Sequence, residues 1–240
     1  MKLVFLDAKT IGDDLDLSQF DQFGEVFKYS FSTPEEVPGR VLDADVIIVN
    51  KILINETSIG TAKKLKLVCV TATGTNNLDK EYLDKRGIAW RNVAGYSTES
   101  VAQHTFAMLF YLLEHLRYYD DYVKNDHYTN DTIFTHFEKT FYELKGKTWG
   151  IIGLGNIGRR VASIANAFGA NVIYSSPSGA APQEGFHQVS LDLLLETADI
   201  VSVHAPLNKH TENLIDFSAF RKMKKSAIFL NLRSEEHTSE

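Results

Sequence analysis

Three glycines with the spacing G-x-G-x-x-G are the residues whose pattern most directly indicates chemistry. Gly153, Gly155 and Gly158 directly follow an apolar run typical of a buried strand, and they open an amphipathic helix that leads to a second strand. Gly153 permits a tight turn, Gly155 lets backbone N–H groups approach a pyrophosphate, and Gly158 allows close helix–strand packing. We therefore predict a dinucleotide site here, with Asn156 and Ile157 beside the phosphates. A turn that binds nothing and an S-adenosylmethionine site are the alternatives.

The end of the second strand fits neither common pattern for recognising the ribose. An acid at this place would hydrogen-bond the ribose hydroxyls of NAD. Ser176 occupies the place instead, with Ser175 and Ser178 close by, and no Arg or Lys is near enough in sequence to attract the 2′-phosphate of NADP. We expect weak discrimination that leans to NAD, because a 2′-phosphate would carry unneutralised charge. Use of NADP stays open.

Short apolar runs alternate with helix-like stretches along most of the chain, which predicts an α/β fold. Several runs are apolar at nearly every position, as in parallel sheets covered on both faces. The runs form two sets, so we expect two Rossmann-like or flavodoxin-like domains with parallel sheets, the nucleotide-binding one incomplete at its C-terminal end. The predicted strands are 2–6, 25–29, 45–50, 65–71 and 88–93, then 148–153, 171–176, 199–204 and 226–231.

One long helix, residues 96–123, is predicted between the two sets. Ser97 and Thr98 could cap it, and it is apolar on all sides from Phe106 to Leu113, which indicates burial all round, between domains or between subunits. Residues 124–147 have a weak period and predict a connection. We place the boundary near residue 98, giving domains of residues 1–98 and 99–240.

Composition excludes several classes of protein. The net charge is −6 without a Lys/Arg block, so neither nucleic acid nor an anionic membrane is an expected partner. The longest apolar run, 106–113, is too short to span a bilayer, and the first residues are too weakly apolar for a signal peptide. We therefore expect a cytoplasmic protein. The eight histidines show no metal-ligand spacing, and the single cysteine, Cys69, lies in an apolar run typical of a buried strand.

Further motifs occur in a fixed order along the chain, and together they are far more specific than the glycine turn. From residue 1 to 232 the chain resembles the D-isomer-specific 2-hydroxyacid dehydrogenases, closest to the glycerate dehydrogenase or hydroxypyruvate reductase type. The motifs are "GTNNLD" (74–79), "GIAWRNVAGYSTESVAQHT" (87–105), "LKGKTWGIIGLGNIGRRVASIANAFGANVI" (144–173), "ADIVSVHAPLNKHTENLI" (198–215) and "MKKSAIFLN" (223–231).

The resemblance implies hydride transfer between a nicotinamide and C2 of a small 2-hydroxy or 2-keto acid such as hydroxypyruvate or glyoxylate. It also implies a substrate domain in residues 1–98 and an NAD(P)-binding domain after it. The long apolar helix suggests a homodimer for the complete protein. The substrate residues expected are Asn50, Lys51, Thr73 and Gly74, although Lys51 could simply be solvated. Besides the glycine turn and the two serines, the cofactor contacts expected are Thr73, His104, His204, Ala205, Pro206, Thr211, Asn231 and Leu232.

The catalytic residues that the resemblance implies are an Arg from an N-x-x-R-G motif, followed by a Glu and a His. Asn231 matches the motif's Asn, but Ser234 stands where the Arg belongs, and Arg233 lies one residue early. No later residues match the Glu or the His. The last eight residues, "RSEEHTSE", match a translation of a common sequencing adapter, so we expect residues 233–240 to be a non-native tail and the chain as written to be inactive. A real, divergent tail is one alternative, and a non-catalytic dinucleotide sensor or corepressor-like protein of the same family is another.

Overall fold

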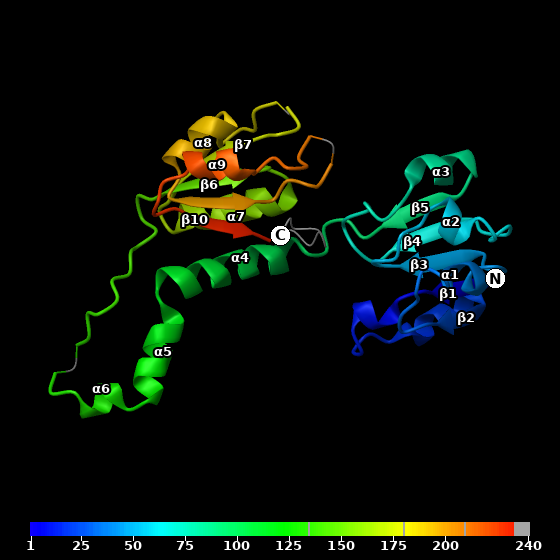
Figure 1. Ribbon diagram of the computed structural model, residues 1–240, viewed down its shortest axis with the longest axis horizontal. Helices are drawn as coiled ribbons and strands as arrows, with labels where there is room; N and C mark the ends of the chain where they lie inside the picture. Colours follow the sequence, from blue (N-terminus) through cyan, green and yellow to red (C-terminus); the bar gives the residue numbers. More distant parts are fainter. Residues whose placement is uncertain (134, 180, 209, 233–240) are drawn as a thin grey trace. The chain divides into compact units, whose positions relative to one another are not determined.

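The computed structural model describes residues 1–133, 135–179, 181–208 and 210–232. The chain divides into two compact units, Met1–Tyr96 and Ser97–Glu240, and each is described by itself (Figure 1). In the described residues each unit contains one five-stranded sheet whose neighbouring strands all run parallel. The predicted α/β fold with two parallel sheets is confirmed.

The sheet of the first unit has the strand order β2-β1-β3-β4-β5, the flavodoxin-like order. Short α-helices cover one face, where Val4 and Ile47 are buried, and two 3-10 helices cover the other, where Phe5 and Ile48 are buried. Because both faces are covered, the central strands β1, β3 and β4 are apolar at almost every position, whereas the edge strands β2 and β5 include charged residues. The elements are β1 (Lys2–Phe5), η1 (Ala8–Ile11), η2 (Leu17–Phe23), β2 (Glu25–Lys28), α1 (Val37–Arg40), β3 (Val46–Val49), α2 (Glu56–Ile59), β4 (Leu67–Val70), α3 (Lys80–Lys85) and β5 (Ala89–Asn92).

The sheet of the second unit has the order β10-β9-β6-β7-β8, the Rossmann order when its strands are counted from β6. Helices α4 and α7 cover one face, and α8 and α9 cover the other. The elements are α4 (Thr98–Leu113), α5 (Leu116–Lys124), α6 (His127–Asn130), β6 (Thr148–Ile152), α7 (Asn156–Ala167), β7 (Asn171–Ser175), β8 (His187–Gln188), α8 (Leu191–Thr197), β9 (Ile200–Val203), α9 (Phe217–Lys222) and β10 (Ile228–Asn231).

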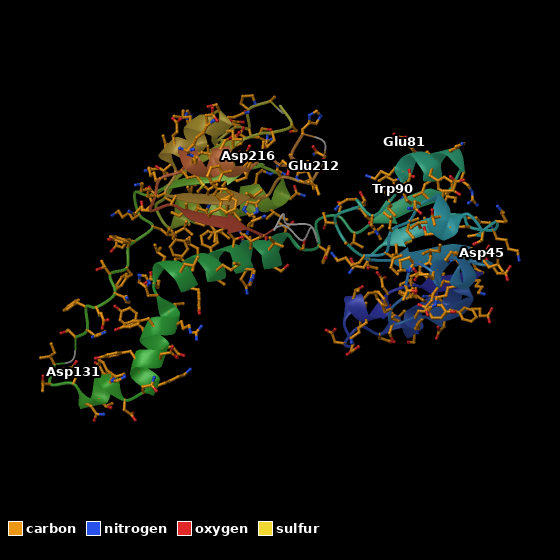
Figure 2. The ribbon with its side chains drawn as sticks, in the orientation of Figure 1. Asp45, Glu81, Trp90, Asp131, Glu212 and Asp216 are labelled. Atoms are coloured by element: carbon orange, nitrogen blue, oxygen red, sulfur yellow. The ribbon has the colours of Figure 1, made fainter. Side chains whose placement is uncertain are left out.

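Aspartates at chain turns fix where several elements begin. Asp216 caps α9 by accepting a hydrogen bond from the Ala219 N–H at 2.9 Å, and Asp45 accepts one from the Lys2 N–H at 2.9 Å (both aspartates are labelled in Figure 2). This backbone bond is the main cause that holds the pKa of Asp45 below its ordinary value. The carboxylate therefore ties the residue before β3 to the start of β1.

The predicted single helix 96–123 is wrong: the structure has two helices, α4 and α5. His115 separates them in the left-handed conformation, with φ at 50°, and its ring nitrogen Nε2 lies 3.1 Å from the Thr140 carbonyl oxygen. Burial all round, between domains or between subunits, is not tested by the single chain, in which Met108, Tyr111 and Leu112 are 38%, 47% and 48% exposed. An apolar strip along one side of α4 thus lacks a partner within the described residues.

The connection predicted at 124–147 includes a short helix, α6, and the end of α5. Stacked rings hold this segment together, since Tyr122 and His136 lie with ring centroids 3.9 Å apart. The Tyr118 hydroxyl donates to the Glu138 carboxylate at 2.8 Å. The described side chains between 116 and 143 add nothing to the buried cores of the sheets. We call residues 116–143 the arm.

Every predicted strand is present, and β8 was not predicted. It consists of His187 and Gln188 and pairs only with Ile173 and Tyr174 at the sheet edge. Cys69 lies in β4 and is half-buried on the face of the first sheet that contains Phe5 and Ile48. Burial raises the pKa of its thiol. In the described part of the chain no helix is long and apolar enough to cross a membrane.

Candidate cofactor and substrate site

The three glycines form the turn between β6 and α7, and two of them are required by close packing. Gly153 has φ at +92°, and a Cβ there would lie 2.6 Å from both Cα and N of Ala205. A Cβ on Gly158 would collide with the Gly153 carbonyl oxygen. The turn is therefore pressed against the segment that follows β9, and α7 is pressed against the turn.

Gly155 differs, because a Cβ there would meet no atom within 4 Å. It is the N-cap residue of α7, so the N–H groups of Asn156, Ile157 and Gly158 belong to the first turn, which has no acceptor within the helix. The helix dipole adds partial positive charge at this end. Within the described residues no other hydrogen bond uses these N–H groups, so they are available to a pyrophosphate, and that contact stays a prediction.

The two serines at the end of β7 have different surroundings. Ser175 is buried, and its carbonyl oxygen accepts the Gly153 N–H at 2.9 Å. Ser176 is half-buried, and its hydroxyl oxygen lies 3.3 Å from that of Ser178. Of the two serines predicted to contact the ribose, Ser176 has the accessible hydroxyl.

The segment after β9 begins with a histidine that is bound into the core. His204 is 8% exposed, and its Nε2 lies 3.1 Å from the Ser202 hydroxyl oxygen, which also accepts a hydrogen bond from Trp149 Nε1 at 2.9 Å. These contacts favour a structural role for His204 beneath the cofactor over a catalytic one.

The other predicted cofactor residues of the second unit lie at three places. Ala205 is buried against the glycine turn, Pro206 is exposed, and Thr211 donates its hydroxyl to the Pro206 carbonyl and accepts the Asn208 N–H, which folds the loop. Asn231 ends β10 beside Val203 of β9, and Leu232 packs on the core next to it. His104 is exposed on α4.

The predicted substrate residues of the first unit lie at the carboxyl ends of its strands. After β3, the backbone N–H groups of Asn50 and Lys51 donate to the buried Asp7 carboxylate at 2.9 and 2.7 Å. The Lys51 side chain is exposed. Asn50 Oδ1 is buried and has no hydrogen-bond partner among the described residues. Asp7 thus fixes the loop that presents Asn50 and Lys51, and it was not predicted.

After β4, a second loop presents Thr73 and Gly74. Thr73 donates its hydroxyl to the Val93 carbonyl at 3.1 Å, and its own carbonyl accepts Asn92 Nδ2 at 2.8 Å. Both Thr73 and Gly74 are exposed, and within the described residues no hydrogen bond uses the Gly74 N–H. The loop is therefore anchored from β5 while a backbone donor faces outward.

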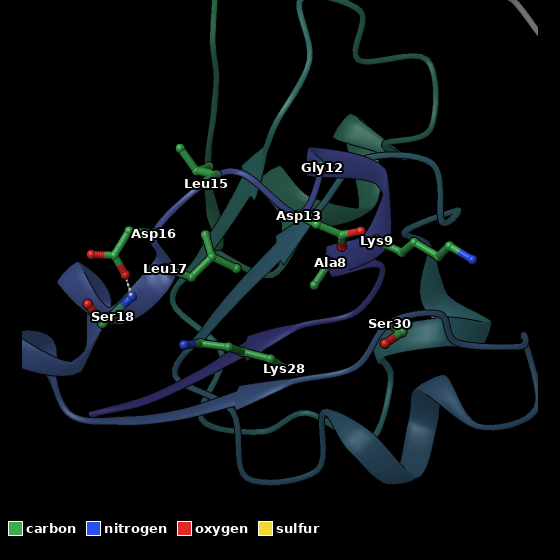
Figure 3. A pocket seen from close by; sticks show the side chains of 10 residues that line it. All are labelled: Ala8, Lys9, Gly12, Asp13, Leu15, Asp16, Leu17, Ser18, Lys28 and Ser30. Atoms are coloured by element: carbon green, nitrogen blue, oxygen red, sulfur yellow. Dashed lines mark hydrogen bonds between the residues drawn. The ribbon is translucent and has the colours of Figure 1, made fainter.

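The first unit also has a pocket that the predicted substrate residues do not line. A pocket of about 620 Å³ lies beside η1 and η2, with Lys9, Lys28 and Asp13 on its walls (Figure 3). None of the four predicted substrate residues lines it, and we assign it no role.

Comparison with known proteins favours a dinucleotide site at the glycine turn over an S-adenosylmethionine site or a turn that binds nothing. Residues 106–235 match the NAD binding domain of the D-isomer specific 2-hydroxyacid dehydrogenases, which is more than half of the chain. The chain belongs to this family. A glycerate dehydrogenase from Methylorubrum extorquens is 32% identical over 231 residues, covering 96% of this chain and 71% of its own. A hydroxypyruvate reductase from Blautia hydrogenotrophica is 32% identical over 239 residues, covering 96% and 74%.

The fold is shared with a solved structure of an acyclic imino acid reductase in complex with NADPH and D-Arg. That structure superposes with a TM-score of 0.86 at 28% identity and covers 96% of this chain and 74% of its own. This D-2-hydroxyacid dehydrogenase is thus an NAD(P)-dependent oxidoreductase acting on 2-hydroxy acids, and the predicted family, reaction class and cofactor class are confirmed.

The structure adds one residue of the cofactor region that the sequence analysis missed. Arg159, in the first turn of α7, donates to the Leu154 carbonyl at 3.3 Å, to Asn156 Oδ1 at 2.6 Å and to Gln183 Oε1 at 3.2 Å. Sequence proximity to β7 does not reveal this guanidinium, because it comes from the helix that precedes β7.

Two further predictions concern catalysis and metals. Arg233, predicted as a displaced catalytic residue, lies outside the described residues. Among the residues that are described, no group of three His, Cys, Asp or Glu side chains could hold a metal ion. The predicted cofactor and substrate residues that the structure describes offer mainly backbone N–H groups, hydroxyls and the Lys51 ammonium.

Proposed function

We propose that this dehydrogenase interconverts hydroxypyruvate and D-glycerate, or glyoxylate and glycolate. The observation that carries the proposal is the glycine turn with open space at Gly155 and unpaired N–H groups behind it, in a chain whose relatives include a glycerate dehydrogenase and a hydroxypyruvate reductase. Both substrates are small acids, so a backbone N–H and one cation are sufficient to bind the carboxylate.

The first unit supplies the substrate contacts in this proposal. The outward Gly74 N–H and the Lys51 ammonium bind the substrate carboxylate, and charge-assisted hydrogen bonds of this kind are among the strong ones. Asp7 holds the Lys51 loop in place through backbone N–H groups, and Thr73 braces the other loop. Asn50 offers a buried oxygen without a partner among the described residues, which suits a substrate hydroxyl as donor.

The second unit supplies the cofactor contacts. Asn156 and Ile157 donate backbone N–H groups to the pyrophosphate, Ser176 hydrogen-bonds the ribose, and Ala205 and Pro206 bound the site on the side of β9. The bound nicotinamide supplies or accepts the hydride. We assign no proton-transfer group among the described residues, because His204 is bound to Ser202 in the core.

Turnover tests this proposal. At the position that matches the family's Arg the chain has Ser234, so we expect the 240-residue chain to bind NAD(P)H but to reduce neither acid measurably. Replacing residues 233–240 with the matching and following segment of the Methylorubrum enzyme should restore oxidation of NADH, followed by its absorbance. A chimera that binds NADH yet reduces neither acid would contradict the proposed substrates.

A non-catalytic dinucleotide sensor or corepressor-like protein is the second candidate. The observation that favours it is Ser234 at the place of the Arg, combined with a well-formed glycine turn. It predicts that cofactor binding changes the affinity for a macromolecular partner and that no segment from a relative restores turnover.

We further propose that the dehydrogenase works as a homodimer in the cytoplasm. The apolar strip of α4 supports the dimer, since exposed apolar surface of this kind marks protein interfaces, and the arm adds exposed rings such as Phe137 and Phe141. A second copy of the chain offers the same strip and arm. Light scattering after size exclusion measures the dimer, and cell fractionation measures the location.

A further inference from the structure

The guanidinium of Arg159 lies between the two segments that border the adenosine ribose in Rossmann folds. On one side it donates to Leu154 and Asn156 of the glycine turn, and on the other to Gln183 of the segment between β7 and β8. It is half-buried, so part of it is accessible to a ligand.

The position of Gln183 shows how the segment after β7 is held. Its backbone N–H donates to the Tyr174 hydroxyl at 2.8 Å, and that hydroxyl donates to Gln188 Oε1 at 3.1 Å. Tyr174 is a buried residue of β7, two positions before Ser176. Tyr174 therefore ties Gln183 and Gln188 to the end of β7, and Arg159 contacts Gln183.

The charge of Arg159 is not neutralised by the described residues. All three of its acceptors are uncharged oxygens, and no carboxylate in the described part of the chain forms an ion pair with it. Glu184, the residue after Gln183, is exposed, and within the described residues it forms no ion pair with Arg159. The next residue, Arg160, is a contrast, because its Nε binds the Glu99 carboxylate at 2.9 Å.

We propose that Arg159 determines cofactor specificity by binding the 2′-phosphate of NADP(H), with the hydroxyls of Ser176 and Ser178 as further donors. The proposal rests on the dinucleotide site at the glycine turn. A nearby Arg is a known means of accepting the 2′-phosphate, whereas an acid at the place of Ser176 would repel it. A phosphate oxygen is also a stronger partner for a guanidinium than the amide oxygen of Gln183, because the hydrogen bond is charge-assisted. The preference thus moves from the weak lean to NAD(H) expected from sequence toward NADP(H).

Two adenosine ligands that lack the nicotinamide separate this proposal from the site on which it rests. 2′,5′-ADP carries the 2′-phosphate and ADP-ribose does not, and calorimetry measures the affinity of each for the 240-residue chain. For Arg159→Gln we expect the affinity for 2′,5′-ADP to fall about 10- to 100-fold, as for a hydrogen bond to a charged group. The affinity for ADP-ribose should stay within about twofold, and Arg159→Lys should keep part of the affinity for 2′,5′-ADP.

Arg160→Gln is the matched control, since it removes the same charge one residue along the same helix and should leave both affinities unchanged. Equal losses for the two ligands in Arg159→Gln would overturn the proposal, because they would mean that Arg159 only holds the loop. An unchanged affinity for 2′,5′-ADP would overturn it too. If neither ligand bound the unaltered chain, the dinucleotide site itself would be refuted, together with the inference.

Discussion

Gly155→Ala and Gly158→Ala add the same methyl group to one turn but should affect different properties. We expect the first to weaken cofactor binding and the second to lower stability. The methyl at 155 meets nothing within 4 Å, and the residue's φ of −75° suits any L-amino acid. Alanine restricts the unfolded chain but is a poorer N-cap than glycine, so we expect the free energy of unfolding to change by less than about 1 kcal/mol. The methyl does occupy the space that the pyrophosphate needs.

Gly158→Ala places its methyl against the Gly153 carbonyl oxygen, with Ile151 Cγ2 only 3.3 Å away. Backbone carbonyl atoms cannot move aside cheaply, so overpacking should cost about 1–3 kcal/mol. For a unit of this size each kcal/mol lowers Tm by about 2–4 °C. Thermal unfolding should therefore show a clearly lower Tm for Gly158→Ala and a change of less than about 4 °C for Gly155→Ala.

Calorimetry with NADH supplies the other half of the comparison. Gly155→Ala should lose about two charge-assisted hydrogen bonds to the pyrophosphate, a drop in affinity of about 100-fold or more. A Gly155→Ala variant that binds NADH like the unaltered chain would refute the placement of the phosphates at this turn. A Gly158→Ala variant with an unchanged Tm would refute the packing argument.

Three further predictions concern pH, substrate and assembly. Burial alone would raise the pKa of Asp199, but hydrogen bonds from the Thr148 N–H and the Lys224 ammonium outweigh it and keep the pKa below its ordinary value. The ionised carboxylate therefore stabilises the fold above about pH 4. This stabilisation is lost as the pH falls through the lowered pKa. Asp199→Asn should cost about 1 kcal/mol in urea unfolding at pH 7 and nothing once both proteins are below that pKa, and an equal cost at every pH would contradict this. Lys51→Met should weaken calorimetric binding of hydroxypyruvate to the NADH complex about two- to tenfold because the side chain is exposed, and an unchanged affinity would show that Lys51 is only solvated. Leu112→Glu, at a position 48% exposed in the single chain, should shift light scattering from dimer to monomer, and a dimer that persists would place the interface elsewhere.

The strands could be predicted from the sequence because parallel strands buried on both faces are apolar throughout. Runs such as "DVIIVN" and "TWGIIG" carry that signal without help from distant residues. Strand β8 carries none, since its two residues are polar and partly exposed, and it forms because the chain passes the edge of β7. The break at His115 was also invisible, because it depends on a left-handed residue whose ring contacts Thr140.

Among the site residues, too, those in a local sequence pattern could be predicted and those that act through distant contacts could not. The glycine turn is a local pattern, so its strand–turn–helix context could be predicted along with Asn156 and Ile157. Asp7 and Arg159 could not, since one acts on backbone groups some 43 residues away and the other reaches across from a helix to a loop. His204, predicted as a cofactor contact, has its ring beside Ser202 in the core, and the cofactor contact stays a prediction.

Titration of the 240-residue chain with NADH, NADPH and S-adenosylmethionine tests whether the Gly153–Gly158 turn is a dinucleotide site. Nucleotide fluorescence and calorimetry together give the affinity and the number of sites. The account predicts one dinucleotide bound per chain, displaced by ADP-ribose, with no binding of S-adenosylmethionine. Binding of S-adenosylmethionine, or of neither dinucleotide, would contradict the assignment of the Gly153–Gly158 turn as the cofactor site of a D-2-hydroxyacid dehydrogenase.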